Sequence, residues 1–237
     1  MSDAPERPED AGGRLTPAEG LAVLHLFCKV GLGADAEAVI AAAKQAADAD
    51  HQVVSFSVLG HKADLGFMLL GPDWHHLRAA QSGFQGAGLE VVDSYVSLTE
   101  VSEYARGMPE EHLRHRLYPV LPPAGKRAFC FYPMSKRRGE GHNWYALEYD
   151  ARKELMMDHG RSGRRFAGRI VQLITGSAGL DDYEWGVTLF GARPDDLKDC
   201  VYTMRFDEAS ARYAEFGPFY AGVVGSVEEV AAEVGLV

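Results

Sequence analysis

Two short segments of this sequence combine side chains that can do redox and metal chemistry. Residues 132–136 (Tyr-Pro-Met-Ser-Lys) place an oxidisable phenol four residues before a cation. Residues 156–160 (Met-Met-Asp-His-Gly) offer one imidazole as a potential metal ligand. An ammonium group can hold a carboxylate, and a phenol can donate a hydrogen bond or, once oxidised, carry a radical. The pair of segments therefore indicates a phenol, a cation and a metal ligand as the starting point for a functional site.

His159 is the candidate metal ligand. It lies four residues after Leu155 and three after Met156, so these side chains share one face of a helix that we expect to end or loosen at Gly160. A hydrogen-bonded structural histidine, or a favourable charge at a helix C-terminus, is the alternative. No second histidine or carboxylate lies at zinc-site spacing, whereas haem iron requires only one axial imidazole.

Tyr132 is the candidate redox residue. The pattern predicts a strand that ends at Tyr132, because Pro133 lacks a backbone donor and ends regular pairing. The phenol would then project into the space between elements, close to Lys136. The alternative is a strand-end tyrosine that only packs.

The ordered set of segments resembles the coproheme decarboxylases of the chlorite dismutase superfamily, in their actinobacterial form. Besides the two segments above, the resemblance rests on Gln172, on residues 185–188 and on residues 204–210, and it spans roughly residues 18 to 225. It implies peroxide-dependent oxidative decarboxylation of Fe-coproporphyrin III (coproheme) to haem b, through a three-propionate intermediate. The porphyrin would be both substrate and redox centre, with hydrogen peroxide as the oxidant.

The resemblance also implies roles for individual residues. His159 would be the proximal iron ligand, Tyr132 the radical relay, Lys136 the group that fixes a carboxylate, and His115 a distal base that deprotonates peroxide. An exposed linker histidine is the alternative for His115. The implied substrate contacts are Tyr132, Pro133, Met134, Ser135, Lys136, Gln172, Ser210 and Arg116.

Several of these assignments leave alternatives open. Ser210 could instead cap a helix, the alignment of Arg116 is in doubt because prolines surround it, and Trp144 would either border the pocket or pack in the core. Gln172 stands where chlorite-splitting relatives carry arginine, which argues against chlorite chemistry. The rival functions are a haem-binding peroxidase or chlorite-dismutase-like enzyme, a non-catalytic haem carrier, and a haem-free interaction module.

The composition argues against some classes of binding partner. A net charge of -10 over 237 residues argues against nucleic acid or an anionic membrane surface, since either needs a dominant basic face. Three cysteines with no close spacing favour buried free thiols in a reducing cytoplasm, and no apolar run approaches the roughly 20 residues that span a bilayer. The resemblance alone implies a homopentamer.

The elements that would position the site follow an α+β order. Residues 1–17 form an expected disordered tail, 18–101 a ferredoxin-like half, 102–127 a connector, and 128–237 a second ferredoxin-like half that binds haem. Tandem repeats of this kind are expected to pack their sheets together in a dimeric α+β barrel-type fold. The strands are predicted at residues 21–30, 53–59, 65–70, 89–96, 128–132, 169–174, 185–190 and 219–224. The helices are predicted at residues 35–47, 72–85, 144–159 and 194–200, with helical character over residues 210–216.

Overall fold

The computed structural model describes residues 13–47, 50–105 and 107–236. Most of the predicted tail, residues 1–12, therefore lies outside the described residues. No helix in the described part of the chain is long and apolar enough to cross a membrane.

The N-terminal half has the predicted order of elements. These are β1 (Ala22–Val30), α1 (Ala36–Ala46), β2 (Gln52–Val58), β3 (Leu65–Gly71), α2 (Trp74–Gly86) and β4 (Leu89–Thr99). Asp35 begins α1 by accepting the backbone N–H of Ala38 at 2.7 Å, and Asp73 begins α2 by accepting that of His75 at 3.0 Å. Such side-chain caps satisfy donors that a helix start leaves unpaired, so both boundaries follow from local chemistry.

The remaining elements follow β4 along the chain. Residues 102–127, the expected connector, hold the short helix η1 (Glu103–Ala105) and α3 (Glu110–Leu117). After it come β5 (Ala128–Lys136), β6 (Arg138–Gly139), β7 (His142–Asn143), η2 (Trp144–Ala146), α4 (Tyr149–Arg164), β8 (Ile170–Gly176), β9 (Trp185–Gly191), α5 (Pro194–Met204), α6 (Glu208–Ala211), β10 (Ala214–Phe216), β11 (Tyr220–Gly225) and α7 (Val227–Glu233). Helices α3 and α7 were not predicted.

The prediction that the strand ends at Tyr132 is wrong. Strand β5 continues through Pro133 to Lys136, because its pairing with β9 runs on to Met134 opposite Trp185. On its other side β5 changes partner around Pro133, from β11 to β10, and the carbonyl of Pro133 accepts the N–H of Gly217 at 2.8 Å. The missing donor of proline is therefore accommodated without ending the strand.

Two helix predictions in the C-terminal half are also wrong. Helix α4 does not end or loosen at Gly160 but continues to Arg164, and it begins only at Tyr149, after the separate turn η2. An internal glycine costs about 1 kcal/mol, which packing of α4 against α5 and α6 can offset. Residues 210–216 are not one helical stretch, because α6 ends at Ala211 and β10 pairs with the end of β5.

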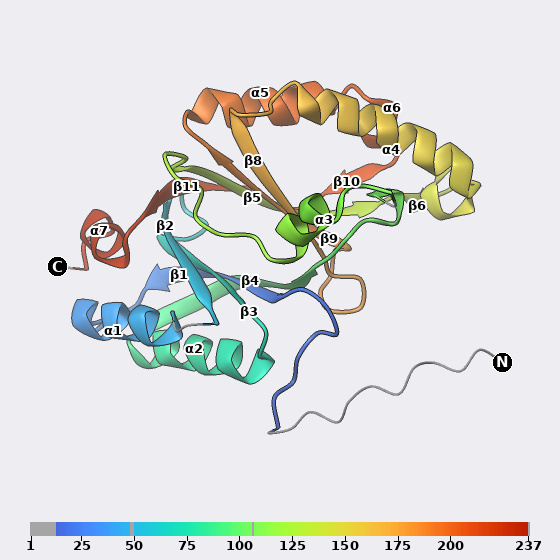
Figure 1. Cartoon of the computed structure of the whole chain (residues 1–237). Coiled ribbons are helices and arrows are strands. Elements are labelled where there is room, and N and C mark those ends of the chain that lie inside the picture. Colours follow the sequence, from blue (N-terminus) through green and yellow to red (C-terminus); the bar gives the residue numbers. More distant parts are fainter. Residues whose placement is uncertain (1–12, 48–49, 106, 237) are drawn as a thin grey trace.

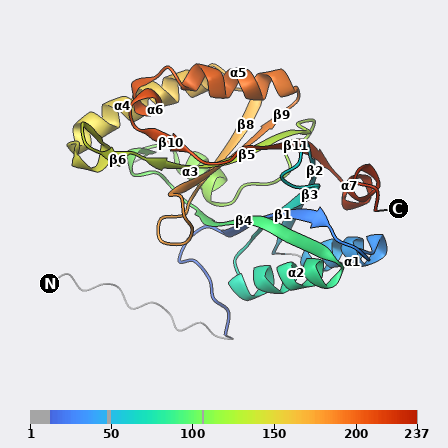
Figure 2. The same cartoon turned by 180° about the vertical axis from the view of Figure 1, so that it is seen from behind.

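All the long strands belong to one antiparallel sheet. Its order is β10-β5-β11-β2-β3-β1-β4-β8-β9, and β5 also pairs with β9, so the hydrogen-bonded sheet closes on itself. Figures 1 and 2 show α1 and α2 on one side of the strands and α4, α5 and α6 on the other. The predicted α+β class is confirmed.

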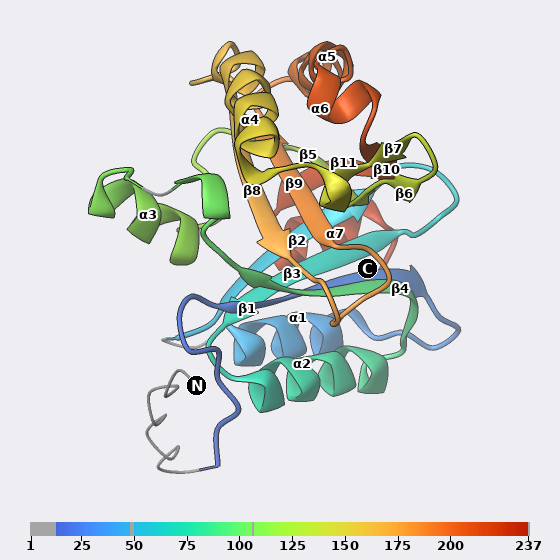
Figure 3. The ribbon, with the colours of Figure 1, turned by 90° about the vertical axis from the view of Figure 1, so that its right-hand side faces the viewer.

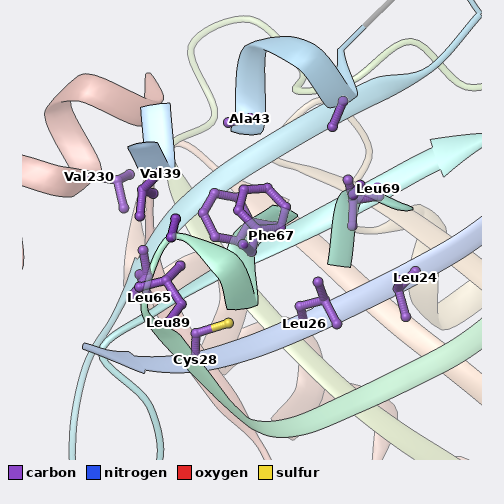
Figure 4. Packing of buried hydrophobic residues seen from close by; sticks show 14 of the residues in the cluster. Leu24, Leu26, Cys28, Val39, Ala43, Leu65, Phe67, Leu69, Leu89 and Val230 are labelled. Carbon is purple, nitrogen blue, oxygen red and sulfur yellow. The ribbon is translucent and has the colours of Figure 1, made fainter. Parts of the chain in front are cut away.

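Separate apolar clusters hold the layers together. One joins α1, α2 and α7 to the outer face of β1 and β3, with Val39, Phe67 and Leu26 among its buried members (Figure 4). A second lies between the two halves of the sheet, where Phe27, Phe56, Phe131 and Phe190 meet. A third packs α5 against β5 and β9 and includes Tyr132. The core of the C-terminal half therefore holds the strand that carries the candidate site.

The buried imidazole of His25 should make the protein sensitive to acid. His25 lies in β1 with no exposed surface, its Nε2 is 3.0 Å from Oγ1 of Thr188, and Nδ1 has no partner among the described residues. Burial lowers the pKa of His25 to about 3, from its ordinary value of 6.5. Between these values the unfolded chain binds a proton that the folded protein excludes, so stability is present above the unfolded pKa and is lost as the pH falls.

We expect wild type to lose more stability than His25→Leu between pH 7.5 and pH 5.0. The extra loss should be about 2 kcal/mol, because one excluded proton contributes about 1.4 kcal/mol per pH unit below 6.5. Urea unfolding at both pH values measures it. His75→Leu, which removes an exposed imidazole from α2, is the control and should behave as wild type. Equal losses in wild type and His25→Leu would contradict the assignment.

Candidate functional site

Tyr132 lies on the face of the C-terminal strands that points toward α4 and α5. The strand register places it beside Val187 of β9, which is itself beside Ile174 of β8. Its ring stacks on Phe219 with centroids 4.5 Å apart and meets the ring of Phe216 edge-on at 5.7 Å. Burial raises the pKa of the Tyr132 phenol, so this side chain holds its proton at neutral pH.

Part of this face remains uncovered. Helix α5 packs against β5, β8 and β9, whereas α4 packs mainly against α5 and α6. Figure 3 shows α4 running above β8 and β9. Gln172 and Ile174 of β8 stay exposed there, Ile174 with 42% of its surface. An exposed strand surface that presents the apolar Ile174 beside the polar Gln172 can accept a flat ligand of mixed character.

His159 of α4 uses one ring nitrogen, Nδ1, for contacts within the protein and leaves the other, Nε2, for a ligand. Its Nδ1 lies 3.0 Å from Oδ2 of Asp207 and 3.4 Å from Oγ of Ser210. Burial would raise the pKa of Asp207, but the hydrogen bond and charge of His159 and the hydrogen bonds from Ser210 lower it. An ionised carboxylate at this distance favours the tautomer that carries the proton on Nδ1 and leaves the Nε2 lone pair free for a metal.

Asp207 also explains why Ser210 lies beside His159. Its Oδ1 accepts the N–H of Ser210 at 3.0 Å and so caps α6, which corrects the sequence-based alternative that Ser210 is itself the cap. One carboxylate therefore fixes both the start of α6 and the orientation of the imidazole. Sequence reasoning missed Asp207, although it lies within the segment of residues 204–210 that carries the resemblance.

Lys136 lies on the same face of β5 as Tyr132, and its side chain extends to α6. Its ammonium donates to the carbonyl of Ala209 at 2.9 Å and lies 4.3 Å from the ring centroid of Trp144. Lys136 is only 8% exposed, and burial lowers its pKa to about 8, while the charges of Asp207 and Glu184 act in the opposite direction. The buried Trp144 therefore packs in the core and also forms one wall of the Lys136 site.

Arg205 supplies a second cation beside Tyr132, which sequence reasoning also missed. Its guanidinium lies 5.2 Å from the ring centroid of Phe216 and 6.0 Å from that of Phe219, the two rings that flank the Tyr132 phenol. These contacts join α5 to residues near β10 and β11, so only the tertiary structure brings them together. A guanidinium in this place can bind a carboxylate with two hydrogen bonds.

Helix α3 carries His115 and Arg116 on an exposed surface. The Nε2 of His115 is 3.9 Å from Oε1 of Glu111, and α3 has no buried side chain. The helix is held at its C-terminal end, where Oγ1 of Thr99 donates to the carbonyl of Leu117 at 2.8 Å. No contact within the described part of the chain joins His115 or Arg116 to Tyr132 or His159.

The donor set fits an iron porphyrin with carboxylate side chains. A single imidazole with a free Nε2 can serve as one axial ligand, since the macrocycle supplies the other nitrogens. Residues 13–47, 50–105 and 107–236 contain no group of three or more His, Cys, Asp or Glu side chains that could hold a metal ion. A cavity of about 550 Å³ lies elsewhere, between α1, α7 and residues 122–127, and among its lining charges Lys44 pairs with Glu228 and Arg127 with Glu229.

Comparison with known proteins points to one family. The model of the chlorite dismutase family matches residues 32–225. A coproheme decarboxylase of Staphylococcus carnosus is 45% identical over 187 residues, which are 74% of this chain and 73% of that protein. A haem-binding protein from Thermus thermophilus has a similar solved structure, with a TM-score of 0.82, 36% identity, and coverage of 94% of this chain and 98% of that one.

A larger relative matches over only part of its length. This relative is a protein of Natronomonas pharaonis that is provisionally named as haem-binding. It is 48% identical over 183 residues, which are 70% of this chain. The match spans 30% of that relative.

Proposed function

We propose that this chain, which belongs to the chlorite dismutase family, oxidatively decarboxylates Fe-coproporphyrin III to haem b. The observation that carries the proposal is the contact between His159 of α4 and the carboxylate of Asp207, on a helix that runs above β8 and β9 of the sheet in which the phenol of Tyr132 is buried. The relative from Staphylococcus carnosus supports the substrate, and the one from Thermus thermophilus supports haem binding.

In this proposal the residues of the site bind and orient the porphyrin. Nε2 of His159 would hold the iron, and Lys136 and Arg205 would hold propionate carboxylates on the side of the site where Tyr132 lies. We keep Pro133, Met134, Ser135, Gln172 and Ser210 as further substrate contacts. His115 as the distal base and Arg116 as a propionate partner rest on the family resemblance alone.

Tyr132 would transfer the oxidising equivalents to the propionate. The bound iron porphyrin, together with hydrogen peroxide, supplies two oxidising equivalents in each round. The phenol gives up its proton and one electron, and its oxygen then takes a hydrogen atom from the β-carbon of the propionate. Loss of a second electron and of carbon dioxide leaves a vinyl group, so two rounds convert two propionates through a three-propionate intermediate.

The remaining proposals concern the whole molecule. We propose a ferredoxin-like half over residues 18–101, a connector over residues 102–127 and a haem-binding half over residues 128–237. Assembly as a homopentamer follows the family. A reducing cytoplasmic location is supported by Cys28, Cys130 and Cys200, which are buried and unpaired.

A direct test is to mix the protein with ferric coproporphyrin III, add hydrogen peroxide in steps, and separate the porphyrins by chromatography. We expect the three-propionate species first and haem b after further peroxide. Bound porphyrin that stays unchanged would identify a carrier, and oxidation of added dyes without porphyrin conversion would identify a peroxidase. Rapid oxygen release from chlorite would favour a chlorite-splitting enzyme. We do not expect this result, because Gln172 stands where chlorite-splitting relatives carry arginine.

A further inference from the structure

Glu184 occupies the point where β5 extends beyond its partner strand. It lies just before β9, is 8% exposed, and its backbone N–H is 3.1 Å from the carbonyl of Met134 and 3.2 Å from Oγ of Ser135. Pairing between β5 and β9 ends with Met134 opposite Trp185. The backbone of Lys136 therefore lies beyond the ladder that β9 provides.

The carboxylate of Glu184 takes the place of the missing strand. Its Oε2 accepts the backbone N–H of Lys136 at 2.8 Å. A buried N–H without a partner would cost about 1–3 kcal/mol, so this contact fixes the extended backbone at the residue whose ammonium contacts Ala209 and Trp144. The alternation of side chains along a strand then keeps Lys136 on the same face as Tyr132.

The other carboxylate oxygen of Glu184 binds the β6–β7 hairpin. Oε1 of Glu184 pairs with the guanidinium of Arg138 in β6, and that guanidinium lies 4.8 Å from the ring centroid of Tyr145. The β6–β7 hairpin leads directly into Trp144, the ring that Lys136 covers. Glu184 thus connects the strand that carries the ammonium with the hairpin that carries its aromatic wall.

Several titratable groups surround the Lys136 ammonium. The titratable groups on the surrounding elements are Asp207 before α6, Glu184 before β9, Arg138 of β6, His142 of β7, Tyr213 between α6 and β10, and His159 of α4 behind Asp207. Asp207 already accepts a hydrogen bond from His159. Asp207 and Glu184 both act on the ammonium, Asp207 more strongly, and Glu184 is the one that also binds the Lys136 backbone.

We propose that Glu184 is a positioning residue for Lys136. The Glu184 carboxylate fixes this lysine in place and, together with Asp207, keeps its ammonium charged for binding a substrate carboxylate. The inference rests on the proposed function in one respect, namely that Lys136 binds a propionate. Burial lowers the pKa of Lys136 to about 8, and the negative charges of Asp207 and Glu184 oppose that shift. Without Glu184 more of the lysine would be neutral at pH 7.5.

The first test measures the protonation of Lys136 in the full chain without porphyrin. Competitive acylation of amines between pH 6 and pH 10, read by mass spectrometry, gives the titration midpoint of this lysine. Glu184→Gln should lower the midpoint by about half a unit to one unit, because a nearby opposite charge has been removed. Glu100→Gln removes a carboxylate that binds Trp185 at 3.1 Å instead, and its midpoint should match wild type. An unchanged midpoint in Glu184→Gln overturns the proposal.

The second test measures binding of ferric coproporphyrin III as a function of pH. Affinity should fall as the pH rises and Lys136 loses its proton. In Glu184→Gln this fall should occur at a lower pH, displaced by the same amount as the titration midpoint of Lys136, and at pH 6.5 the affinity should return to the wild-type value. A uniform loss at every pH would indicate a merely structural role and would overturn the electrostatic part. Failure of the proposed function would leave the acylation result intact while no haem b formed in wild type.

Arg138→Gln provides a variant on an exposed side chain, for the case that Glu184→Gln does not fold. It releases the outer carboxylate oxygen but keeps the charge of Glu184. The midpoint of Lys136 should stay at or above that of wild type, while affinity for ferric coproporphyrin III falls by about threefold, as for one lost hydrogen bond. Unchanged affinity would overturn the positioning part of the proposal.

Discussion

Tyr132→Phe should bind ferric coproporphyrin III nearly as well as wild type but should form almost no haem b. The ring keeps its packing against Phe216 and Phe219, so the binding surface stays in place. Only the hydroxyl is lost, and with it the group that we propose to pass a proton and an electron between the substrate and the oxidising centre. Removing such a group reduces rates by about 100-fold or more. Chromatography of the porphyrins after peroxide titration measures the effect.

Tyr95→Phe is the matched control for this experiment. Tyr95 is also a buried phenol of the sheet, but its hydroxyl donates to the carbonyl of Tyr183 at 3.0 Å and takes no part in the proposed site. This variant should convert bound coproporphyrin as wild type does. Normal yields of haem b from Tyr132→Phe would exclude the phenol as the relay, whereas porphyrin binding and consumption of peroxide would still identify a haem protein.

His159→Ala should lose most of its affinity for ferric coproporphyrin III. The imidazole is the proposed iron ligand, and the contact of its Nδ1 with Asp207 leaves Nε2 to bind the metal. Loss of a residue that only orients a metal ligand costs about 10–100-fold in affinity, so loss of the ligand itself should cost about 100-fold or more. Absorption titration measures it, and added imidazole should restore part of the ferric spectrum.

Asp207→Asn separates the ligand from its support. It keeps the size of the side chain but removes the charged acceptor for Nδ1 of His159, so affinity should fall by about 10–100-fold with the histidine-type spectrum retained. His61→Ala removes an exposed imidazole and should behave as wild type. A wild-type spectrum and affinity in His159→Ala would exclude this histidine as the ligand.

The sequence by itself determined the elements whose boundaries depend on neighbouring residues. Asp35 and Asp73 mark the starts of α1 and α2, because a cap is made within three residues. Alternating apolar residues marked β2, and its pairing with β3 follows from the short turn between them. The α+β class and the family resemblance also come from the sequence, since both depend on the order of segments and not on their contacts.

Elements that depend on distant partners were decided by the tertiary structure. Strand β5 continues beyond Pro133 because β9 and β10 lie beside it, and α4 continues beyond Gly160 because α5 and α6 pack against it. Local propensity gives the opposite answer at both places. The competing term is pairing or packing with a segment more than 20 residues away, which single-residue preferences do not contain.

The candidate site divides in the same way. Residue types made Tyr132, Lys136 and His159 candidates, because phenol, ammonium and imidazole have distinct chemistry, and the family resemblance favoured them over the packing alternatives. Their partners were not visible: Asp207 and Glu184 each lie 48 residues from the group they hold, and Arg205 reaches Tyr132 only across two aromatic rings. Hydrogen bonds and charges act over a few ångströms of space, whatever the separation along the chain. The folded arrangement alone therefore decides which ring nitrogen of His159 carries a proton and how strongly the ammonium of Lys136 keeps its charge.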